Sequence, residues 1–300
     1  MIIKILIAVL ILLIVSNNIS ILTDYLKVSG VVPRSMGKYL VATSMAIGLI
    51  LEGNKMSKFV QEFNLSNEIS TLTLAILISI FIIGNLIKLP TSATLTTVGV
   101  LIGVNIFFGR DLNLSRLYYL GGIWLVSPII SILFAYSLYK LMKEKVYNLN
   151  INKAISMTAT IFLSYTFGVN TLGLLNSIGV VPDTIQMVLV VISIYVGSIF
   201  LSAKVGEEIS KTFHSYTVKT HTSISLSTAL ILEIASNISI PIPLTSLIVL
   251  SLIGPIAAKK TRIINMKNFK KVVIFWILTP LISFILSYGF LTMTYYIIFF

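Results

Sequence analysis

The sequence predicts an all-α polytopic membrane protein with about ten transmembrane segments, arranged as two inverted five-segment repeats. Three observations support this prediction: charged residues make up only 11% of the 300 residues, long apolar runs follow one another, and short motifs recur about 150 positions apart. A soluble domain usually has about a quarter charged residues, because water must solvate its surface. With so few charges, we expect lipid to cover most of this surface.

Ten apolar runs are long enough to cross the hydrocarbon core, which requires about 20 residues of helix. Splitting the chain at glycine, proline and charge clusters predicts membrane segments near 2–23, 36–53, 68–88, 91–109, 117–140, 154–178, 184–203, 222–239, 241–258 and 272–299. Little more than Pro241 separates the eighth segment from the ninth, which indicates a hairpin of shorter pieces. The first run ends in Ser16, Asn17 and Asn18 rather than in a signal-peptide cleavage pattern, so we treat it as a membrane segment.

The basic residues predict how these segments are oriented. Five of the 22 Lys and Arg residues lie at the amino terminus or in even-numbered loops, and the other 17 lie in odd-numbered loops. Since basic residues collect in cytoplasmic loops, we expect a multi-pass protein of the cell membrane with both termini outside. The same rule accounts for the net charge of +12, whereas nucleic-acid binding would need a water-exposed basic face. We therefore expect the lipid bilayer, and no nucleic acid, as a partner.

The residue types argue against most kinds of catalytic site. The chain has no cysteine, which excludes disulfides, thiol catalysis and thiolate metal sites. Its ten acids are scattered singly, and the two histidines, His214 and His221, fall in the predicted seventh loop, where we expect them to be solvated. Asp24 and Glu52 lie near segment ends, where we expect them at the membrane interface. The sequence thus predicts neither an enzyme nor a metal or resident cofactor, and leaves a scaffold or sensor as an alternative to a transporter.

Motifs in the two halves of the chain recur in the same order. The matched pairs, separated by 149 to 153 positions, are Trp124–Pro128 with Trp276–Pro280, Leu89–Gly103 with Ile240–Gly254, Gly48 with Gly197, and Asn17 with Asn170. We interpret the tryptophan pair as a packing and kink element. The matches predict one repeat over residues 1–145 and a second over 146–300. Five crossings per repeat invert one half relative to the other, an architecture typical of secondary transporters.

Polar residues inside apolar helices predict a substrate site, because they are costly in lipid unless they line a cavity. One group interrupts the first and sixth segments, and the other follows a proline at the head of the fourth and ninth. Proline starts a helix well, and the free N–H groups of a first turn attract an anion. We expect the substrate-binding residues to be Asn17, Asn18, Ser92, Thr94, Asn170, Thr171, Thr245 and Ser246. For each residue, a purely structural hydrogen bond is the alternative.

A single acid stands out at membrane depth. Glu233 lies in the middle of the eighth apolar segment and has no acidic counterpart in the first half. A carboxylate there can bind a coupling sodium ion or proton, or it can be a locally paired structural residue. We therefore treat Glu233 as a candidate coupling-ion site.

In order and spacing, these paired elements resemble the inorganic phosphate transporter (PiT) family of ion-coupled permeases. Each half of that family carries a Gly-Ala-Asn-Asp-x-Ala-Asn-Ala motif and later a Pro-Val-Ser-Thr-Thr-His motif. Here Leu89–Leu95 and Ile240–Ser246 resemble the second motif, while Val15–Asn18 and Gly168–Thr171 stand where the first belongs. The resemblance implies a secondary-active phosphate permease, a symporter, which works by alternating access around an anion site at the repeat interface near the membrane midplane.

The chain departs from the family motifs at several positions, and in the second copy the Ser-Thr-Thr triplet is reduced to Pro243, Leu244 and Thr245. Asn18 and Thr171 stand in place of the motif aspartates, and Leu95 and Ser246 in place of the histidines. In the family those aspartates are expected to serve cation and substrate binding. The resemblance therefore leaves open whether sodium or a proton is the coupling cation and whether sulfate or another oxyanion is the cargo. A homodimer is compatible with it, and so is a non-transporting membrane relative.

Overall fold

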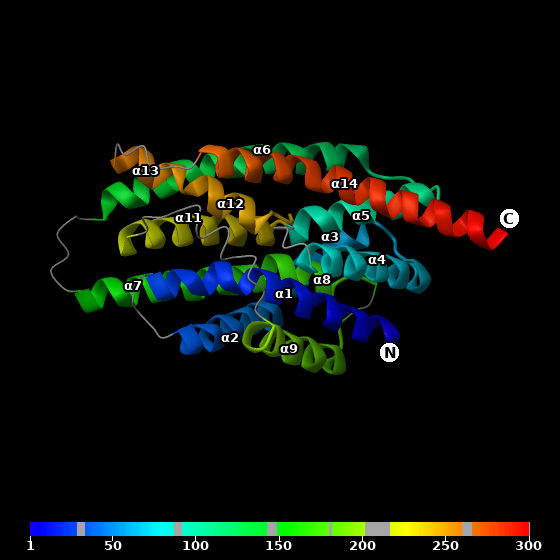
Figure 1. Cartoon of the computed structure of the whole chain (residues 1–300), viewed down its shortest axis with the longest axis horizontal. Coiled ribbons are helices and arrows are strands. Elements are labelled where there is room, and N and C mark those ends of the chain that lie inside the picture. Colours follow the sequence, from blue (N-terminus) through cyan, green and yellow to red (C-terminus); the bar gives the residue numbers. More distant parts are fainter. Residues whose placement is uncertain are drawn as a thin grey trace.

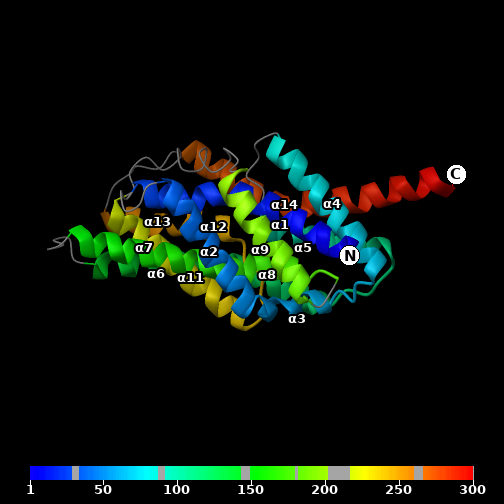
Figure 2. The ribbon, with the colours of Figure 1, turned by 90° about the horizontal axis from the view of Figure 1, so that it is seen from below.

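A computed structural model describes residues 1–28, 34–86, 92–142, 149–179, 182–201, 217–259 and 266–299. Every regular element in these ranges is a helix, which confirms the predicted all-α class. Figure 1 shows an elongated bundle whose long helices run roughly along one axis, with both termini at the same end. The view from below in Figure 2 shows α4 and the end of α14 diverging at that end.

The helices of the first half are α1 (Ile2–Val28), α2 (Arg34–Glu52), the 3-10 helix η1 (Gly53–Met56), α3 (Ser57–Gln61), α4 (Asn67–Leu86), α5 (Ala93–Phe107) and α6 (Leu114–Leu141). Those of the second half are α7 (Leu149–Phe167), the π-helical turn η2 (Gly168–Leu172), α8 (Gly173–Asn176), α9 (Thr184–Ile199), α11 (Val218–Asn237), α12 (Leu244–Ser251), α13 (Ile253–Lys259) and α14 (Met266–Phe299). Each predicted segment corresponds to one helix or to consecutive short helices. The ninth segment is divided into α12 and α13.

Within the described residues, five helical stretches are long and apolar enough to cross a membrane. They cover Ile2–Thr23, Asn67–Leu86, Leu114–Leu141, Ile151–Asn176 and Trp276–Ile297. The helices α6 and α14 expose many apolar side chains, including Leu125, Ile129, Leu133, Leu281 and Ile285. A soluble protein rarely exposes such large apolar faces, so the exposed side chains of these two helices are those of a multi-pass membrane protein.

The predicted repeat is visible in the packing of the helices. In the first half α5 packs against α14, and in the second half the equivalent pair, α12 and α13, packs against α6. The contact of α1 with α9 likewise matches that of α7 with α2, and the contact of α4 with α1 matches that of α11 with α7. Figure 1 shows α1 and α7 starting at opposite ends of the bundle. Each half thus completes its packing with helices of the other.

Two glycines make equivalent close approaches between the halves. A Cβ atom added at Gly48 of α2 would lie 2.1 Å from the carbonyl oxygen of Tyr165 in α7. A Cβ atom added at Gly197 of α9 would lie 2.7 Å from the carbonyl oxygen of Leu12 in α1. The two glycines were matched in the sequence, and their contact partners, Leu12 and Tyr165, are also 153 positions apart. Small residues let membrane helices approach this closely, so these glycines fix the same helix crossing twice.

Two predictions need correction, and others fall on residues that the structure does not describe. Helix α1 continues through Asn17 and Asn18, so the expected break in the first segment does not occur, whereas the sixth segment does change to a π-helical turn at Gly168–Leu172. The sequence prediction for His221 was wrong: this residue is buried in α11, not solvated in a loop. Pro90, the proline at the head of the predicted fourth segment, and His214 fall outside the described residues, as does the side chain of Asp24.

Candidate functional site

The side chain of Asn170 joins the π-helical turn η2 to the segment between α11 and α12. Its amide nitrogen donates to Ser236 Oγ at 3.0 Å and to the carbonyl oxygen of Ile240 at 2.9 Å. Its amide oxygen accepts from the backbone N–H of Ile242 at 3.0 Å. Asn170 is fully buried, and π-helical turns often occur at functional sites. One carboxamide therefore holds the non-helical backbone before α12 in place.

The amino-terminal end of α5, in the first half of the chain, also contacts the segment between α11 and α12. Thr94, in the first turn of α5, donates a hydrogen bond of 3.4 Å to the carbonyl oxygen of Ile242. Ser92 is the N-cap of this helix and is buried, and its side chain makes no capping hydrogen bond. Trp124 of α6 reaches the segment as well, since its Nε1 donates to the carbonyl oxygen of Pro241 at 2.8 Å. The amino-terminal ends of α5 and α12 therefore meet beside η2.

The helices begin later than their prolines suggested. Helix α12 starts at Leu244, after Pro241 and Pro243, and places Thr245 and Ser246 in its first turn. Ser246 is buried and Thr245 half-buried. A helix start has N–H groups without intrahelical partners, and the helix dipole adds partial positive charge there. Two such starts, meeting inside the bundle, provide donors for an anion.

Asn17 and Asn18 are placed differently from Asn170. Asn17 of α1 donates to the side-chain oxygen of Asn85, at the end of α4, at 2.6 Å. Asn18 donates to the carbonyl oxygen of Ile14 in its own helix at 2.9 Å. Both are buried. Asn17 thus ties α1 to α4, while the hydrogen bond of Asn18 is of the structural kind that the sequence left as an alternative.

Several buried hydroxyl groups near these helix heads have no hydrogen-bond partner among the described residues. They include the Oγ1 atoms of Thr96 and Thr97 in α5 and of Thr171 in η2. Leaving a buried polar group unsatisfied costs roughly 1–3 kcal/mol, so such groups call for a bound water or ligand. Thr171, which was predicted as a site residue, is therefore available to a ligand next to Asn170.

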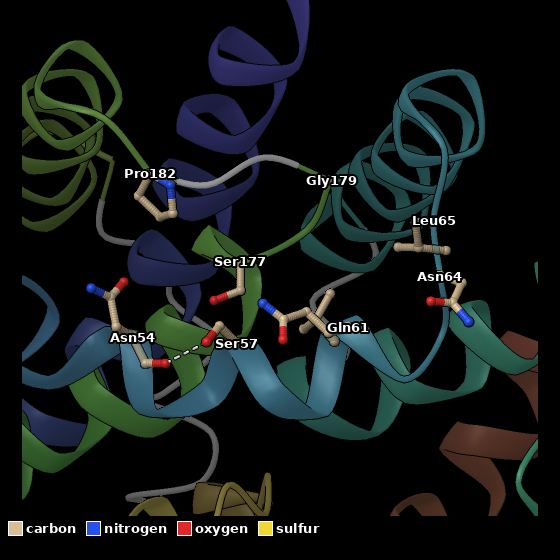
Figure 3. A pocket seen from close by; sticks show the side chains of 9 residues that line it. Asn54, Ser57, Gln61, Asn64, Leu65, Ser177, Gly179 and Pro182 are labelled. Carbon is tan, nitrogen blue, oxygen red and sulfur yellow. Dashed lines mark hydrogen bonds between the residues drawn. The ribbon is translucent and has the colours of Figure 1, made fainter.

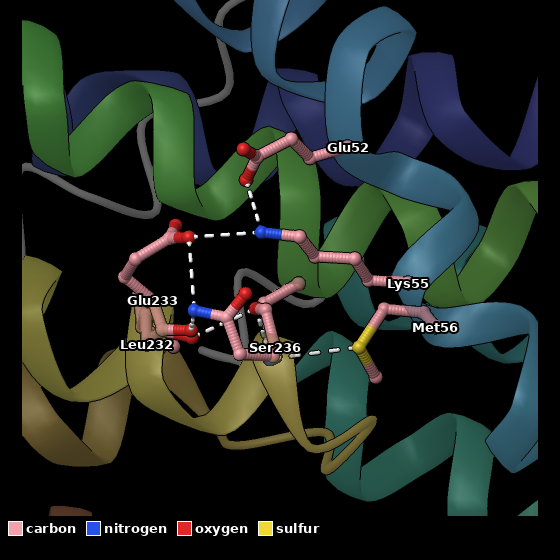
Figure 4. Close-up of polar contacts among 8 residues, drawn as sticks. Glu52, Lys55, Met56, Leu232, Glu233 and Ser236 are labelled. Carbon is pink, nitrogen blue, oxygen red and sulfur yellow. Dashed lines mark hydrogen bonds and ion pairs between the residues drawn. The ribbon is translucent and has the colours of Figure 1, made fainter.

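Glu233 belongs to an ion cluster that connects the two halves (Figure 4). The ammonium of Lys55, in η1, lies 3.1 Å from Glu233 Oε1 and 2.6 Å from Glu52 Oε2. Asn237 donates to Glu233 Oε1 at 3.3 Å, while Glu233 Oε2 is buried without a partner among the described residues. Burial opposes the charged form of Lys55, but the hydrogen bonds that it donates to Glu52 and Glu233 outweigh this effect and raise the pKa of Lys55 from its ordinary value. The cluster therefore holds one cation between two carboxylates.

Sequence reasoning did not identify Lys55, Met56, Asn85 and Ser236. Ser236 and Asn85 lie 151 positions apart and bind the matched residues Asn170 and Asn17, so a residue-by-residue comparison of the halves would have found them. Met56 Sδ lies 3.8 Å from Asn170 Nδ2, a contact that no sequence pattern signals. The two carboxylates of the ion cluster were predicted separately, as an interfacial residue and an ion site, but their shared partner was not.

His221 makes a second buried polar cluster in the second half. Its Nδ1 lies 2.8 Å from Ser156 Oγ in α7, and its Nε2 lies 2.9 Å from Ser225 Oγ in α11. These contacts satisfy both ring nitrogens between α7 and α11. The cluster thus ties the two helices together.

Together, the all-helical fold and its long apolar helices define a multi-pass membrane protein. A solved sodium-dependent phosphate transporter has the same fold, with a TM-score of 0.83 over 96% of each chain at 18% sequence identity. A candidate phosphate permease of Methanocaldococcus jannaschii is 26% identical over an alignment of 218 positions, which covers 67% of each of the two chains. The model of the phosphate transporter family matches residues 150–287 of this chain. These findings confirm the resemblance to the phosphate transporter family, whose members are transporters and not enzymes.

Proposed function

We propose that this protein is a secondary-active permease for inorganic phosphate, which it binds where η2 and the heads of α5 and α12 meet. The observation that carries the proposal is the convergence of Asn170 and Thr94 on one buried segment, since they come from different halves of the chain and both bond to Ile242. The family match and the names of the two relatives support phosphate as the cargo.

The proposed pocket provides uncharged hydrogen-bond donors for an anion. Its hydroxyl and carboxamide groups come from Asn17, Asn18, Ser92, Thr94, Asn170, Thr171, Thr245 and Ser246. The hydroxyl of Thr171 has no partner among the residues that the structure describes, and the first-turn N–H groups of α5 and α12 add backbone donors. Asn17 is bound to Asn85 and Asn18 to its own helix, so we assign them a supporting place at the rim of the pocket.

The paired packing of the two halves supports a mechanism of alternating access. We assign the repeats to residues 1–145 and 146–300, with the anion site at their interface near the membrane midplane. In inverted-repeat transporters, one repeat moves against the other around a fixed site. The three equivalent helix pairs described above support this arrangement. A second copy of the chain, forming a homodimer, would bury part of the exposed apolar faces of α6 and α14.

The proposed orientation places both termini outside the cell. At the opposite end of the bundle, Lys219 lies 4.2 Å and Lys259 5.5 Å from the ring centre of Tyr139, and Lys140 lies 4.6 Å from that of Tyr136. Basic residues at a membrane surface favour the cytoplasmic side. This lysine-rich end therefore supports the orientation.

Glu233 is the proposed coupling-ion site. Its free oxygen Oε2 can take up a proton or contact a sodium ion. The motif aspartates are replaced by Asn18 and Thr171. Glu233 lies three positions before Ser236, the partner of Asn170, and no other acid of the described residues lies as near to Ser236 in the sequence. The solved relative is named as sodium-dependent, which supports a cation-coupled symporter.

Uptake by the purified protein in liposomes tests this function. We expect labelled phosphate to accumulate faster than in empty liposomes, and faster when a sodium or proton gradient is imposed from outside. Sulfate in place of phosphate tests the alternative cargo. If neither anion enters faster than in empty liposomes, the protein is a non-transporting relative, and the proposal is wrong.

A further inference from the structure

A cavity of about 680 Å³ lies on the terminal side of the candidate site (Figure 3). It is lined by Asn54, Ser57, Val60, Gln61, Asn64, Leu65, Ser177, Gly179 and Pro182. These residues come from η1, α3 and the following turn, and from the chain between α8 and α9. Asp183, next to Pro182, pairs with Lys4 near the amino terminus, which places the cavity at the end of the bundle that holds both termini.

The lining of this cavity suits a hydrated anion. Five of its side chains are neutral and polar, and none of the nine lining residues is an acid. At the rim, Arg110 donates a hydrogen bond to the carbonyl oxygen of Asn64. The acid that follows Gln61, Glu62, is paired with Arg116 at 3.3 Å. An oxyanion in the cavity would therefore meet hydrogen-bonding groups and a nearby guanidinium without facing an unpaired carboxylate of the lining.

The helix η1 separates the cavity from the candidate site. Asn54 of η1 and Ser57, the first residue of α3, line the cavity, whereas Met56 between them is buried and contacts Asn170. The carbonyl oxygen of Lys55 accepts a hydrogen bond from Ser239 Oγ. The same short helix therefore has the cavity on one side and the segment before α12 on the other.

Lys55 connects this helix to the second half through a salt bridge. Its ammonium lies between Glu52 of its own half and Glu233 of α11 (Figure 4). Lys55 and Glu233 are about one-quarter exposed, so water screens the pair only in part. Breaking this bridge would remove the ionic contact between η1 and α11 and leave the hydrogen bond from Ser239 to Lys55.

We propose that the cavity is the outer antechamber of the anion site, that it receives a tetrahedral oxyanion, and that η1 is the partition that the Lys55–Glu233 salt bridge keeps closed. The identity of the anion rests on the proposed function, but the partition does not. In this structure the partition is closed, because Asn170, Ser236 and Met56 are all buried. Opening then requires Lys55 to leave Glu233.

The absence of cysteine from the chain allows a direct accessibility test. Ser57→Cys places one thiol in the antechamber, Ser236→Cys places one behind the partition, and Asn67→Cys is an exposed control outside the cavity. Each is made alone, and Ser236→Cys is also combined with Lys55→Met, Glu233→Gln or Lys55→Arg. The labelling rate is measured in proteoliposomes with a membrane-impermeant, positively charged thiol reagent.

We expect Ser57→Cys and Asn67→Cys to be labelled quickly, and Ser236→Cys slowly. A closed state that opens only about 10% of the time or less predicts a rise of about tenfold for Ser236→Cys when the salt bridge is removed. Lys55→Met and Glu233→Gln should both cause this rise, and Lys55→Arg should not. Unchanged labelling of Ser236→Cys in both neutral variants, or an unlabelled Ser57→Cys, would overturn the partition.

Phosphate provides the second arm of the experiment. Millimolar phosphate should slow the labelling of Ser57→Cys and leave Asn67→Cys unchanged, and sulfate tests whether the antechamber distinguishes the two oxyanions. If neither anion protects Ser57→Cys while wild-type liposomes take up phosphate, the antechamber assignment fails and the proposed function stands. If the liposomes take up neither anion while removal of the salt bridge still exposes Ser236→Cys, the function fails and the partition stands.

Discussion

Asn170 donates a hydrogen bond of 3.0 Å to Ser236, and this bond has a counterpart in the other half of the chain. There Asn17 donates to Asn85 at 2.6 Å, 153 and 151 positions earlier. In both places a side chain of the first membrane segment of a half binds the end of the third segment, which is α4 in the first half and α11 in the second. Asn170 makes more hydrogen bonds than Asn17, because its side chain also binds the backbone of Ile240 and Ile242.

Because Gly48 lies so close to Tyr165, we expect any side chain at position 48 to lower the stability of the folded protein. Gly48→Ala would bring a Cβ atom within 2.1 Å of a backbone oxygen, and the helices would have to move apart. We expect a loss of about 1–3 kcal/mol, the usual cost of overpacking a core, seen as a lower midpoint of thermal unfolding in detergent.

Gly121→Ala is the matched control, since nothing lies within 4 Å of the added atom. In the middle of α6, alanine should stabilise the helix by roughly 0.5–1 kcal/mol. Equal unfolding midpoints for the two variants would contradict the assigned packing of α2 on α7.

Trp124 positions the segment before α12 and is more than a packing residue. Trp124→Phe keeps most of the ring but leaves the carbonyl oxygen of Pro241 without this donor. An unsatisfied carbonyl costs about 1–3 kcal/mol, and we expect the loss to appear as a raised KM for phosphate uptake. Trp276→Phe provides the comparison at the matched position. An unchanged KM for Trp124→Phe would show that this hydrogen bond does not shape the site.

Glu233 predicts how uptake depends on the coupling ion. If a proton is the coupling ion, an imposed proton gradient speeds wild-type uptake, and Glu233→Gln abolishes this effect because an amide cannot carry the proton. If sodium is the coupling ion, the same variant loses the sodium dependence instead. Glu62→Gln, which removes the acid of a surface pair with Arg116, should retain the wild-type profile. A Glu233→Gln variant with both dependences intact would exclude this residue as the coupling site.

Much of the fold was predictable because the bilayer imposes strong limits on sequence. Each apolar run had to become a helix, and the matched glycines and prolines indicated which helices are equivalent. The pairing of Gly48 with Gly197 was confirmed by their equivalent contacts with Tyr165 and Leu12.

The details of the site were less predictable, because they depend on contacts between residues far apart in the chain. Asn17 and Asn18 look alike in sequence, yet Asn17 reaches another helix and Asn18 bonds to its own. The Lys55–Glu233 pair spans 178 positions, and no local pattern indicates it. His221 looked like a loop residue because many hydroxyl groups lower the hydropathy of α11, although serines of α7 and α11 bind its ring inside the bundle.

Phosphate uptake by Asn170→Ala, compared with Asn105→Ala, tests the central claim most directly. Both residues are buried asparagines, but among the described residues the side chain of Asn105 bonds only to the carbonyl oxygen of Leu101, in its own helix. We predict that Asn170→Ala lowers kcat/KM by about tenfold or more, as expected when about 1.4 kcal/mol of binding is lost, while Asn105→Ala stays near wild type at equal amounts of folded protein. Equal uptake by both variants would contradict an anion site built around Asn170.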